Sequence, residues 1–270
     1  MRSIWKETYD KNAHTFVVCA YGDSPYLEEC VCSLLAQKVK TRILVSTSTP
    51  TDSIASLAHT YQLPLFINRG DTGLGGDWNF AMRCSETPLV TLAHQDDRYE
   101  ENYTERVLTV LNACRHPLLA FTDYYELRDG QRVESNHLLR VKRRMLLPMQ
   151  VPFFWKSRFL RRRILSLGNP ICCPSVTLVK ENLPEFVFTN SMKSNLDWQA
   201  WEEISRKKGE FAYVPSPCME HRIHFDSATS RVLKTDGRWE EDLQVLRRFW
   251  PEGIARRIEG VYRKAERSNE

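Results

Sequence analysis

Two adjacent carboxylates, Asp96 and Asp97, follow the apolar run "PLVTLA" at residues 88–93, with His94 just before them. Such a run is typical of a buried strand. Carboxylate oxygens at a strand end are ligands that hard divalent cations prefer, and a strand end is a fixed platform. A second interpretation is a helix cap, because Asp97 and Glu100 have the spacing of a capping box. At this point the sequence predicts either a metal site or a helix N-terminus.

The elements that must position these carboxylates alternate between strand and helix. Apolar, β-branched runs predict strands at 15–20, 41–46, 64–68, 88–93 and 118–125. The segments between them have helical spacing, with helix starts expected at Ser24-Pro25 and at Thr49-Pro50-Thr51-Asp52. This alternation predicts an α/β fold, a three-layer α/β/α sandwich with a mostly parallel central sheet. Because ligands of such sheets bind beyond the carboxyl ends of the strands, the carboxylate pair lies where a ligand is expected.

The composition is that of an ordinary globular protein, with 42% hydrophobic and 27% charged residues in 270. The start "MRSIWKETYDKNAH" lacks the apolar core of a signal peptide, and no run approaches the roughly 18 apolar residues of a spanning helix. We therefore expect a cytoplasmic protein. The eight cysteines form no Cys-x-x-Cys pair, so we expect reduced, structural thiols.

The glycine-rich turn "NRGDTGLGGDWNF" at 68–80 fits neither the Gly-x-Gly-x-x-Gly fingerprint nor a P-loop. It indicates close backbone approach at a helix start, which serves either packing or ligand contact.

Five stretches in this order resemble family 2 glycosyltransferases of the GT-A type: "FVVCAYGDSPYLEECVCSLLAQ", "GGDWNFAM", "LVTLAHQDD", "SNLDWQAW" and "HRIHFDSATS". They resemble, in turn, that family's opening strand and helix, its Arg-Asn helix start, its metal-binding motif, its catalytic-base helix and its late histidine segment. The resemblance covers roughly residues 14–230. It implies a GT-A-like domain over 1–235, followed by a helical extension over 236–270.

The resemblance also implies roles for individual residues. Asp96 and Asp97 would hold Mg²⁺ or Mn²⁺ on the diphosphate of a nucleotide sugar, with His224 as a further metal or diphosphate contact. Asp197 would accept the proton of the attacking acceptor hydroxyl. Asp197 could instead complement a helix dipole, and His224 could be structural. Donor contacts are implied at Ala20, Tyr21, Asp23, Thr47, Ser48, Asn79, Gln95 and Asp96.

Two departures from the family concern the donor. Ser46, Thr47 and Ser48 stand where the family usually carries an Asp-Asp pair that reads the base, although hydroxyls can still bond a base. Trp78 stands where an arginine before Asn79 is common. The donor nucleotide therefore stays open among UDP, dTDP and GDP.

The segment 140–163, "RVKRRMLLPMQVPFFWKSRFLRRR", contains nine Lys or Arg and no acid. It is either a solvated loop and helix or a peripheral contact with an anionic membrane face. No nucleic-acid motif accompanies the charge, so we expect no nucleic-acid partner. From 236 onward two helices are expected, interrupted at Pro251, which pack on the domain or mediate a homodimer.

The predicted function is transfer of a hexosyl unit from a nucleotide-sugar donor to a hydroxyl of a glycan or lipid-linked saccharide, as in polysaccharide biosynthesis. The resemblance implies one direct displacement with inversion. Two rivals remain: a non-catalytic sugar- or partner-binding module, and a nucleotidyltransferase. The latter needs a glycine-rich loop after the first strand, which "CAYGDSPY" lacks.

Overall fold

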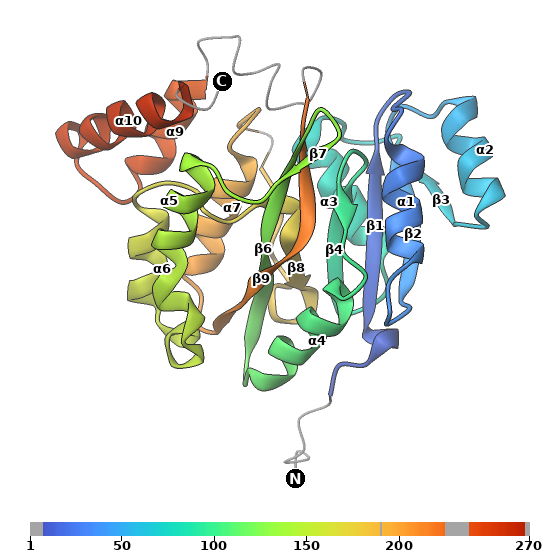
Figure 1. Cartoon of the computed structure of the whole chain (residues 1–270), viewed down its shortest axis with the longest axis horizontal. Coiled ribbons are helices and arrows are strands. Elements are labelled where there is room, and N and C mark those ends of the chain that lie inside the picture. Colours follow the sequence, from blue (N-terminus) through green and yellow to red (C-terminus); the bar gives the residue numbers. More distant parts are fainter. Residues whose placement is uncertain (1–7, 190, 225–237, 268–270) are drawn as a thin grey trace.

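The computed structural model describes residues 8–189, 191–224 and 238–267 and confirms the predicted α/β fold (Figure 1). Within these residues the strands form one sheet in the order β3-β2-β1-β4-β8-β6-β9-β5, with β7 beside β6. Their bounds are β1 (His14–Ala20), β2 (Arg42–Thr47), β3 (Leu65–Ile67), β4 (Leu89–His94), β5 (Arg98–Tyr99), β6 (Pro117–Arg128), β7 (Gln131–Val133), β8 (Val176–Val179) and β9 (Glu210–Ile223).

Strands β1 to β4, β6 and β9 run in one direction, while β8 lies antiparallel between β4 and β6. Parallel strands are buried on both faces, which explains why β1 and β4 are almost continuous apolar runs. The carboxyl ends of β1, β2 and β4 consequently meet at one edge, as the alternating pattern predicts.

Helices flank the sheet on both sides, with α1 and α2 beside β1 and β2, and with α5 to α7 beyond β6 and β9 (Figure 1). Helix α3 packs against β1, β2 and β4, and α4 packs against β6 and β9. The helix bounds are α1 (Leu27–Leu35), α2 (Asp52–Thr60), α3 (Leu74–Cys84), α4 (Tyr103–Ala113), α5 (His137–Leu146), α6 (Arg158–Leu165), α7 (Leu196–Ser205), α9 (Arg238–Leu246) and α10 (Glu252–Arg267). Short 3₁₀ turns include η2 (Leu147–Gln150), η3 (Pro152–Lys156) and η4 (Cys173–Ser175).

Of the helix starts that the sequence predicts, one is confirmed, one begins later in the chain and one does not form. Thr51 caps α2, because its hydroxyl accepts a hydrogen bond from the Ile54 N–H at 3.3 Å. Helix α1 begins at Leu27, later than the Ser24-Pro25 start. The cap interpretation of Asp97 is wrong, since the residues after it form β5 rather than a helix. The long-range pairing of β5 with β9 overrides the local capping-box pattern.

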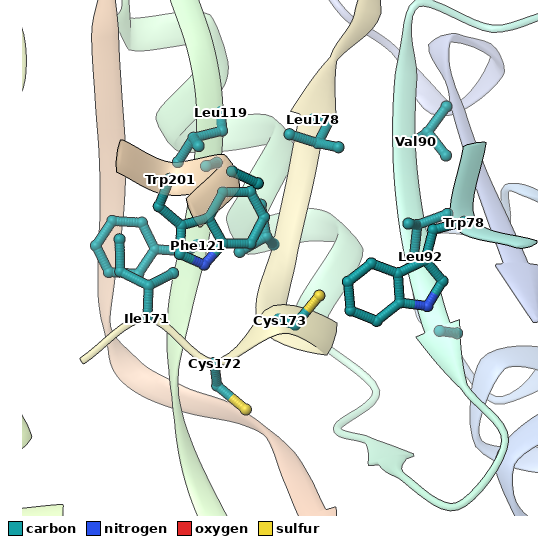
Figure 2. Packing of buried hydrophobic residues seen from close by; sticks show 14 of the residues in the cluster. Trp78, Val90, Leu92, Leu119, Phe121, Ile171, Cys172, Cys173, Leu178 and Trp201 are labelled. Carbon is teal, nitrogen blue, oxygen red and sulfur yellow. The ribbon is translucent and has the colours of Figure 1, made fainter. Parts of the chain in front are cut away.

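Buried side chains from α3, α7 and the strands β4, β6 and β8 belong to one hydrophobic cluster (Figure 2). Trp198 and Trp201 are each 1% exposed, so they belong to the core. The eight cysteines are free thiols. Cys172 and Cys173 belong to the same buried cluster (Figure 2), and burial raises the pKa of both thiols well above its usual value. They therefore stay protonated and are poor nucleophiles.

The predicted C-terminal helices, separated at Pro251, are α9 and α10. Helix α9 packs on α7, and Trp250 donates a hydrogen bond from Nε1 to the Ser166 carbonyl at 2.8 Å. The proposed boundary between 235 and 236 lies outside the described residues. No helix in the described part of the chain combines the length and apolarity needed to cross a bilayer.

Candidate active site

A cavity of about 780 Å³ opens at the carboxyl ends of β1, β2 and β4, a volume suited to a nucleotide-sized ligand. Most of the predicted site residues line it: Ala20, Tyr21, Asp23, Thr47, Gln95, Asp96, Asp197 and His224. Ser48, Asn79 and Asp97 are not among the lining residues. The sheet edge thus brings together segments separated by almost the whole chain.

Three side chains after β4 could hold a metal ion. Ligand atoms of His94, Asp96 and Asp97 all lie within 4.8 Å of one another. Asp97 is 1% exposed, and its Oδ2 has no hydrogen-bond partner among the described residues. Leaving a buried charged oxygen unpartnered costs upwards of about 1–3 kcal/mol. The arrangement fits a divalent cation, which would supply the missing partner.

The other oxygen of Asp97 is fully engaged by β9. Asp97 Oδ1 accepts hydrogen bonds from the Arg222 backbone N–H at 2.8 Å and from His221 Nδ1 at 3.0 Å. Burial opposes protonation of His221, but the charge of Asp97 and this hydrogen bond outweigh it and raise the His221 pKa. The register of β5 with β9 pairs Arg98 with Glu220, and this sets His221 beside Asp97.

His224 lies next to Asp96 rather than in the three-residue cluster. Its Nε2 is 2.9 Å from Asp96 Oδ2, and its ring meets Tyr26 edge-on at 5.1 Å between centroids. Burial works against ionisation of Asp96, but the nearby His94, the hydrogen bond from His224 and the charge of His221 together hold its pKa below the usual value. Asp96 is therefore an anion ready to bind a cation.

The residues after β1 and β4 are tied together through Gln95. Its Oε1 accepts from the Tyr21 N–H at 2.9 Å, and its Nε2 donates to the Tyr21 carbonyl at 3.0 Å. Gly22 has φ of +59°, a left-handed conformation suited to glycine, and its N–H donates to Thr49 Oγ1 at 2.7 Å. These bonds hold the Tyr21 ring, which is 60% exposed, at the rim of the cavity.

Sequence reasoning missed Asp77, which lines the cavity from the first turn of α3. Its Oδ2 accepts from Ser48 Oγ at 2.9 Å, and its Oδ1 accepts from Asn68 Nδ2 at 2.8 Å. A carboxylate is thus present beside the hydroxyls that end β2, although another element supplies it. The signal was the unusual acid in "LGGDW" within the glycine-rich turn. Gly76 in that turn serves packing, because a Cβ there would lie 2.4 Å from the Asp71 carbonyl oxygen.

Of the two residues after Asp77, Trp78 lines the cavity and Asn79 does not. Asn79 donates to the Phe188 carbonyl at 2.8 Å and accepts from the Phe188 N–H at 2.7 Å, so its amide holds a distant loop. Trp78 is buried and stacks on His94 with ring centroids 5.4 Å apart. Trp78 therefore supports a candidate ligand where an arginine would have faced the donor.

Asp197 lies in the first turn of α7 and faces the same cavity as Asp96. Its Oδ2 accepts a hydrogen bond from Asn169 Nδ2 at 2.8 Å. The turn before α7 is held by Glu241 of α9, which accepts from the backbone N–H groups of Lys193, Ser194 and Asn195. The position suits both a base and a helix-dipole partner, so the two alternatives stay open.

The sequence was compared with models of known protein families. The model of glycosyl transferase family 2 matches residues 15–183. The chain therefore belongs to this family, as the five stretches predict. Asp197 and His224 lie beyond the matched residues, so their roles rest on the arrangement described above.

Solved structures with the same fold include S. aureus TarS residues 1–349 in complex with UDP-GlcNAc, at 13% identity and a TM-score of 0.62 over 94% of this chain and 72% of that one. The mannosyltransferase PcManGT from Pyrobaculum calidifontis, in complex with GDP-Man and Mn²⁺, matches at 13% identity and a TM-score of 0.61, over 90% and 66%. No curated protein matches the sequence.

Proposed function

We propose that the protein transfers a sugar, a hexosyl unit, from a nucleotide-sugar donor to an acceptor hydroxyl with the help of a divalent cation. The observation that carries this proposal is the buried Oδ2 of Asp97, which has no hydrogen bond among the described residues and lies 3.9 Å from His94 Nδ1. His94 and Asp96 line the cavity that Asp197 also lines, so the candidate cation site and the candidate base border the same cavity.

The donor set fits Mg²⁺ or Mn²⁺. Asp96 and Asp97 would offer carboxylate oxygens, and His94 would offer a ring nitrogen. The hydrogen bond between His224 and Asp96 would orient the Asp96 carboxylate. A bound divalent ion would neutralise the negative charge that develops on the leaving nucleoside diphosphate. The mannosyltransferase that carries GDP-Man and Mn²⁺ supports this choice of ions.

The chain's own residues would orient the acceptor and move its proton. Asp197 would accept the proton of the acceptor hydroxyl as that oxygen attacks the anomeric carbon, and Asn169 would fix the orientation of the carboxylate. A single displacement of this kind inverts the anomeric configuration. The attack is favoured when both partners are held in line within one cavity.

Donor recognition would fall to residues at the ends of β1 and β2. Tyr21, Asp23 and Thr47 line the cavity there, with Asp77 supplying a carboxylate next to them. We leave Asn79 out of this set because its amide is engaged by Phe188. UDP, dTDP and GDP remain the candidate nucleotides, and the acceptor we propose is a glycan or lipid-linked saccharide. The division into a domain at 1–235 and an extension at 236–270, the cytoplasmic location and a homodimer remain predictions.

A thermal-unfolding screen of UDP, dTDP and GDP, each with and without Mn²⁺, tests this proposal. A ligand at about 100 times its Kd stabilises the native state by about 2.7 kcal/mol. We expect at least one nucleotide to raise the unfolding temperature only when Mn²⁺ is present, and the matching sugar nucleotides then to support transfer. A non-catalytic module predicts neither result. If no nucleotide stabilises the protein with Mn²⁺, the proposed function is wrong.

A further inference from the structure

The segment that joins α5 to α6 exposes a group of apolar and basic side chains outside the active-site cavity. Phe153 is 67% exposed, Leu147 55% and Val151 49%. We define the basic-aromatic surface by its exposed members: Arg140, Arg144, Leu147, Val151, Phe153, Phe154 and Lys156. In Figure 1 this segment belongs to the flank of α5 and α6, on the opposite side of the molecule from α1 and α2.

This exposure follows from how the segment is anchored. Met149 and Trp155 are buried, and Trp155 Nε1 donates to the Met149 carbonyl at 2.7 Å. With these two side chains held inside, η2 and η3 turn their other apolar side chains outward. The rings of Phe153 and Phe154 contact edge-on at 5.5 Å between centroids. A cluster of exposed apolar side chains on a surface is typical of an interaction site.

The charge around this cluster has one sign. The sequence contains no Asp or Glu between Glu134 and Glu181. Several basic residues there have internal partners, such as Arg143 with Asp123 and Arg162 with Glu202. By contrast, the exposed side chains of Arg140, Arg144 and Lys156 form no ion pair with the described residues. Their charge is available to an anionic partner.

A cavity of about 260 Å³ lies at the same place. Among its lining residues are Arg140, Arg143, Arg144, Leu147 and Gln150. Asp123 also lines it, but the Arg143 side chain pairs with that carboxylate at 2.7 Å. The remaining arginines leave the cavity positive, and Leu147 connects it to the exposed apolar side chains. The chemistry is that of a phosphate-bearing headgroup site bordered by apolar groups.

We propose that the basic-aromatic surface docks the protein onto an anionic phospholipid bilayer. Arg140 and Arg144 bind headgroup phosphates, while Phe153, Phe154 and their aliphatic neighbours enter the boundary between headgroups and acyl chains. A nucleic acid fits less well, because no nucleic-acid-binding motif accompanies the charge and the aliphatic side chains of Leu147 and Val151 share the surface with the two Phe rings. This inference is independent of the proposed sugar transfer, since binding needs neither donor nor metal.

Co-sedimentation of the full chain with vesicles tests the proposal. We expect binding to vesicles that contain phosphatidylglycerol, weak binding to pure phosphatidylcholine, and release as salt shortens the screening length to about 10 Å or less. Arg140→Gln with Arg144→Gln should lower the partition coefficient by about five-fold per arginine, so about 25-fold together. Phe153→Ser with Phe154→Ser should lower it by at least about ten-fold.

The matched control is Lys207→Gln with Lys208→Gln, which removes the same charge from exposed positions elsewhere. All variants alter exposed side chains, and their unfolding temperatures should stay close to that of the wild type. Equal binding to neutral and anionic vesicles, or equal losses in the control and the arginine variant, would overturn the proposal. So would tight binding to a fluorescent single-stranded RNA by a protein that ignores both kinds of vesicle.

Discussion

Glu241 on α9 and Ser194 before α7 are joined by two hydrogen bonds to the same carboxylate oxygen. Oε2 of Glu241 accepts from the Ser194 backbone N–H at 2.9 Å and from the Ser194 hydroxyl at 2.6 Å. Burial opposes ionisation of Glu241, but these donors and the neighbouring N–H groups hold its pKa below the usual value. A C-terminal helix therefore sets the position of the turn that leads into Asp197.

The first prediction follows from this contact. Glu241→Gln removes the charge that gathers the N–H groups before α7, so the start of the helix should shift slightly. We expect transfer turnover to fall by up to about 10²-fold with donor KM nearly unchanged, because small misplacements of catalytic groups are costly. The control is Glu240→Gln, the exposed neighbour on α9. A purely structural role for Glu241 would lower the unfolding temperature without this split between kcat and KM.

The second prediction concerns the cation site. Replacing Asp96 and Asp97 together by Asn should abolish Mn²⁺-dependent nucleotide binding, because it removes both carboxylates. The metal-free variant should still fold, since the lost pairs with His221 and His224 are offset in part by no longer burying a carboxylate oxygen without a hydrogen bond. Asp129→Asn, in an exposed turn, is the control. Isothermal titration calorimetry with and without Mn²⁺ measures the effect, and undiminished metal-dependent binding would remove the metal assignment.

The third prediction separates the two interpretations of Asp197. A base is needed when the acceptor attacks and not when the donor binds. Asp197→Asn should therefore keep donor affinity within a few-fold while transfer slows by about 10²-fold or more. The helix-dipole interpretation expects only a few tenths of a kcal/mol less stability and nearly normal transfer. Donor Kd and transfer rate, measured on the same variant, distinguish them.

The fourth prediction tests Asp77 as a donor contact. If its carboxylate binds the nucleoside directly, Asp77→Ala should weaken nucleotide binding by roughly 10- to 150-fold, the equivalent of a charged hydrogen bond worth about 1.5–3 kcal/mol. If it only holds Ser48 and Asn68, the unfolding temperature should fall while nucleotide affinity changes little. Affinities for UDP, dTDP and GDP should be compared, because a direct contact with the base would also alter the preference among them.

The fifth prediction is acid sensitivity at His14. Its ring is 1% exposed between Thr41 and Thr91, and burial lowers its pKa to about 3. Between the unfolded pKa of about 6.5 and this value, the unfolded chain binds a proton that the folded chain does not. The free energy of unfolding should therefore fall as pH drops through this window, by at most about 1.4 kcal/mol per pH unit.

The measurement is urea unfolding at several pH values between neutral and mildly acidic. His14→Gln should have a smaller pH slope than the wild type, whatever its absolute stability, because glutamine does not titrate. Equal slopes in the two proteins would mean that His14 does not dominate the acid sensitivity.

The local pattern of the chain was enough to determine the α/β alternation and the edge of the sheet at which the cavity opens. Strand and helix periods depend on neighbours two to four residues apart, so 15–20, 41–46 and 88–93 could be assigned without knowing any distant contact. Parallel packing then required their carboxyl ends to share one edge. For the same reason Asp96 could be placed at that edge before the structure was known.

Tertiary structure alone decided which side chains meet there. Asp97 fits a capping box by spacing, and only the pairing of β5 with β9 places it before a strand and beside His221. The contacts of Asp77 and Glu241 could not be predicted from the sequence either, because their partners lie on other elements. Such contacts depend on the direction in which whole helices and strands pack, and spacing along one segment carries no information about that direction.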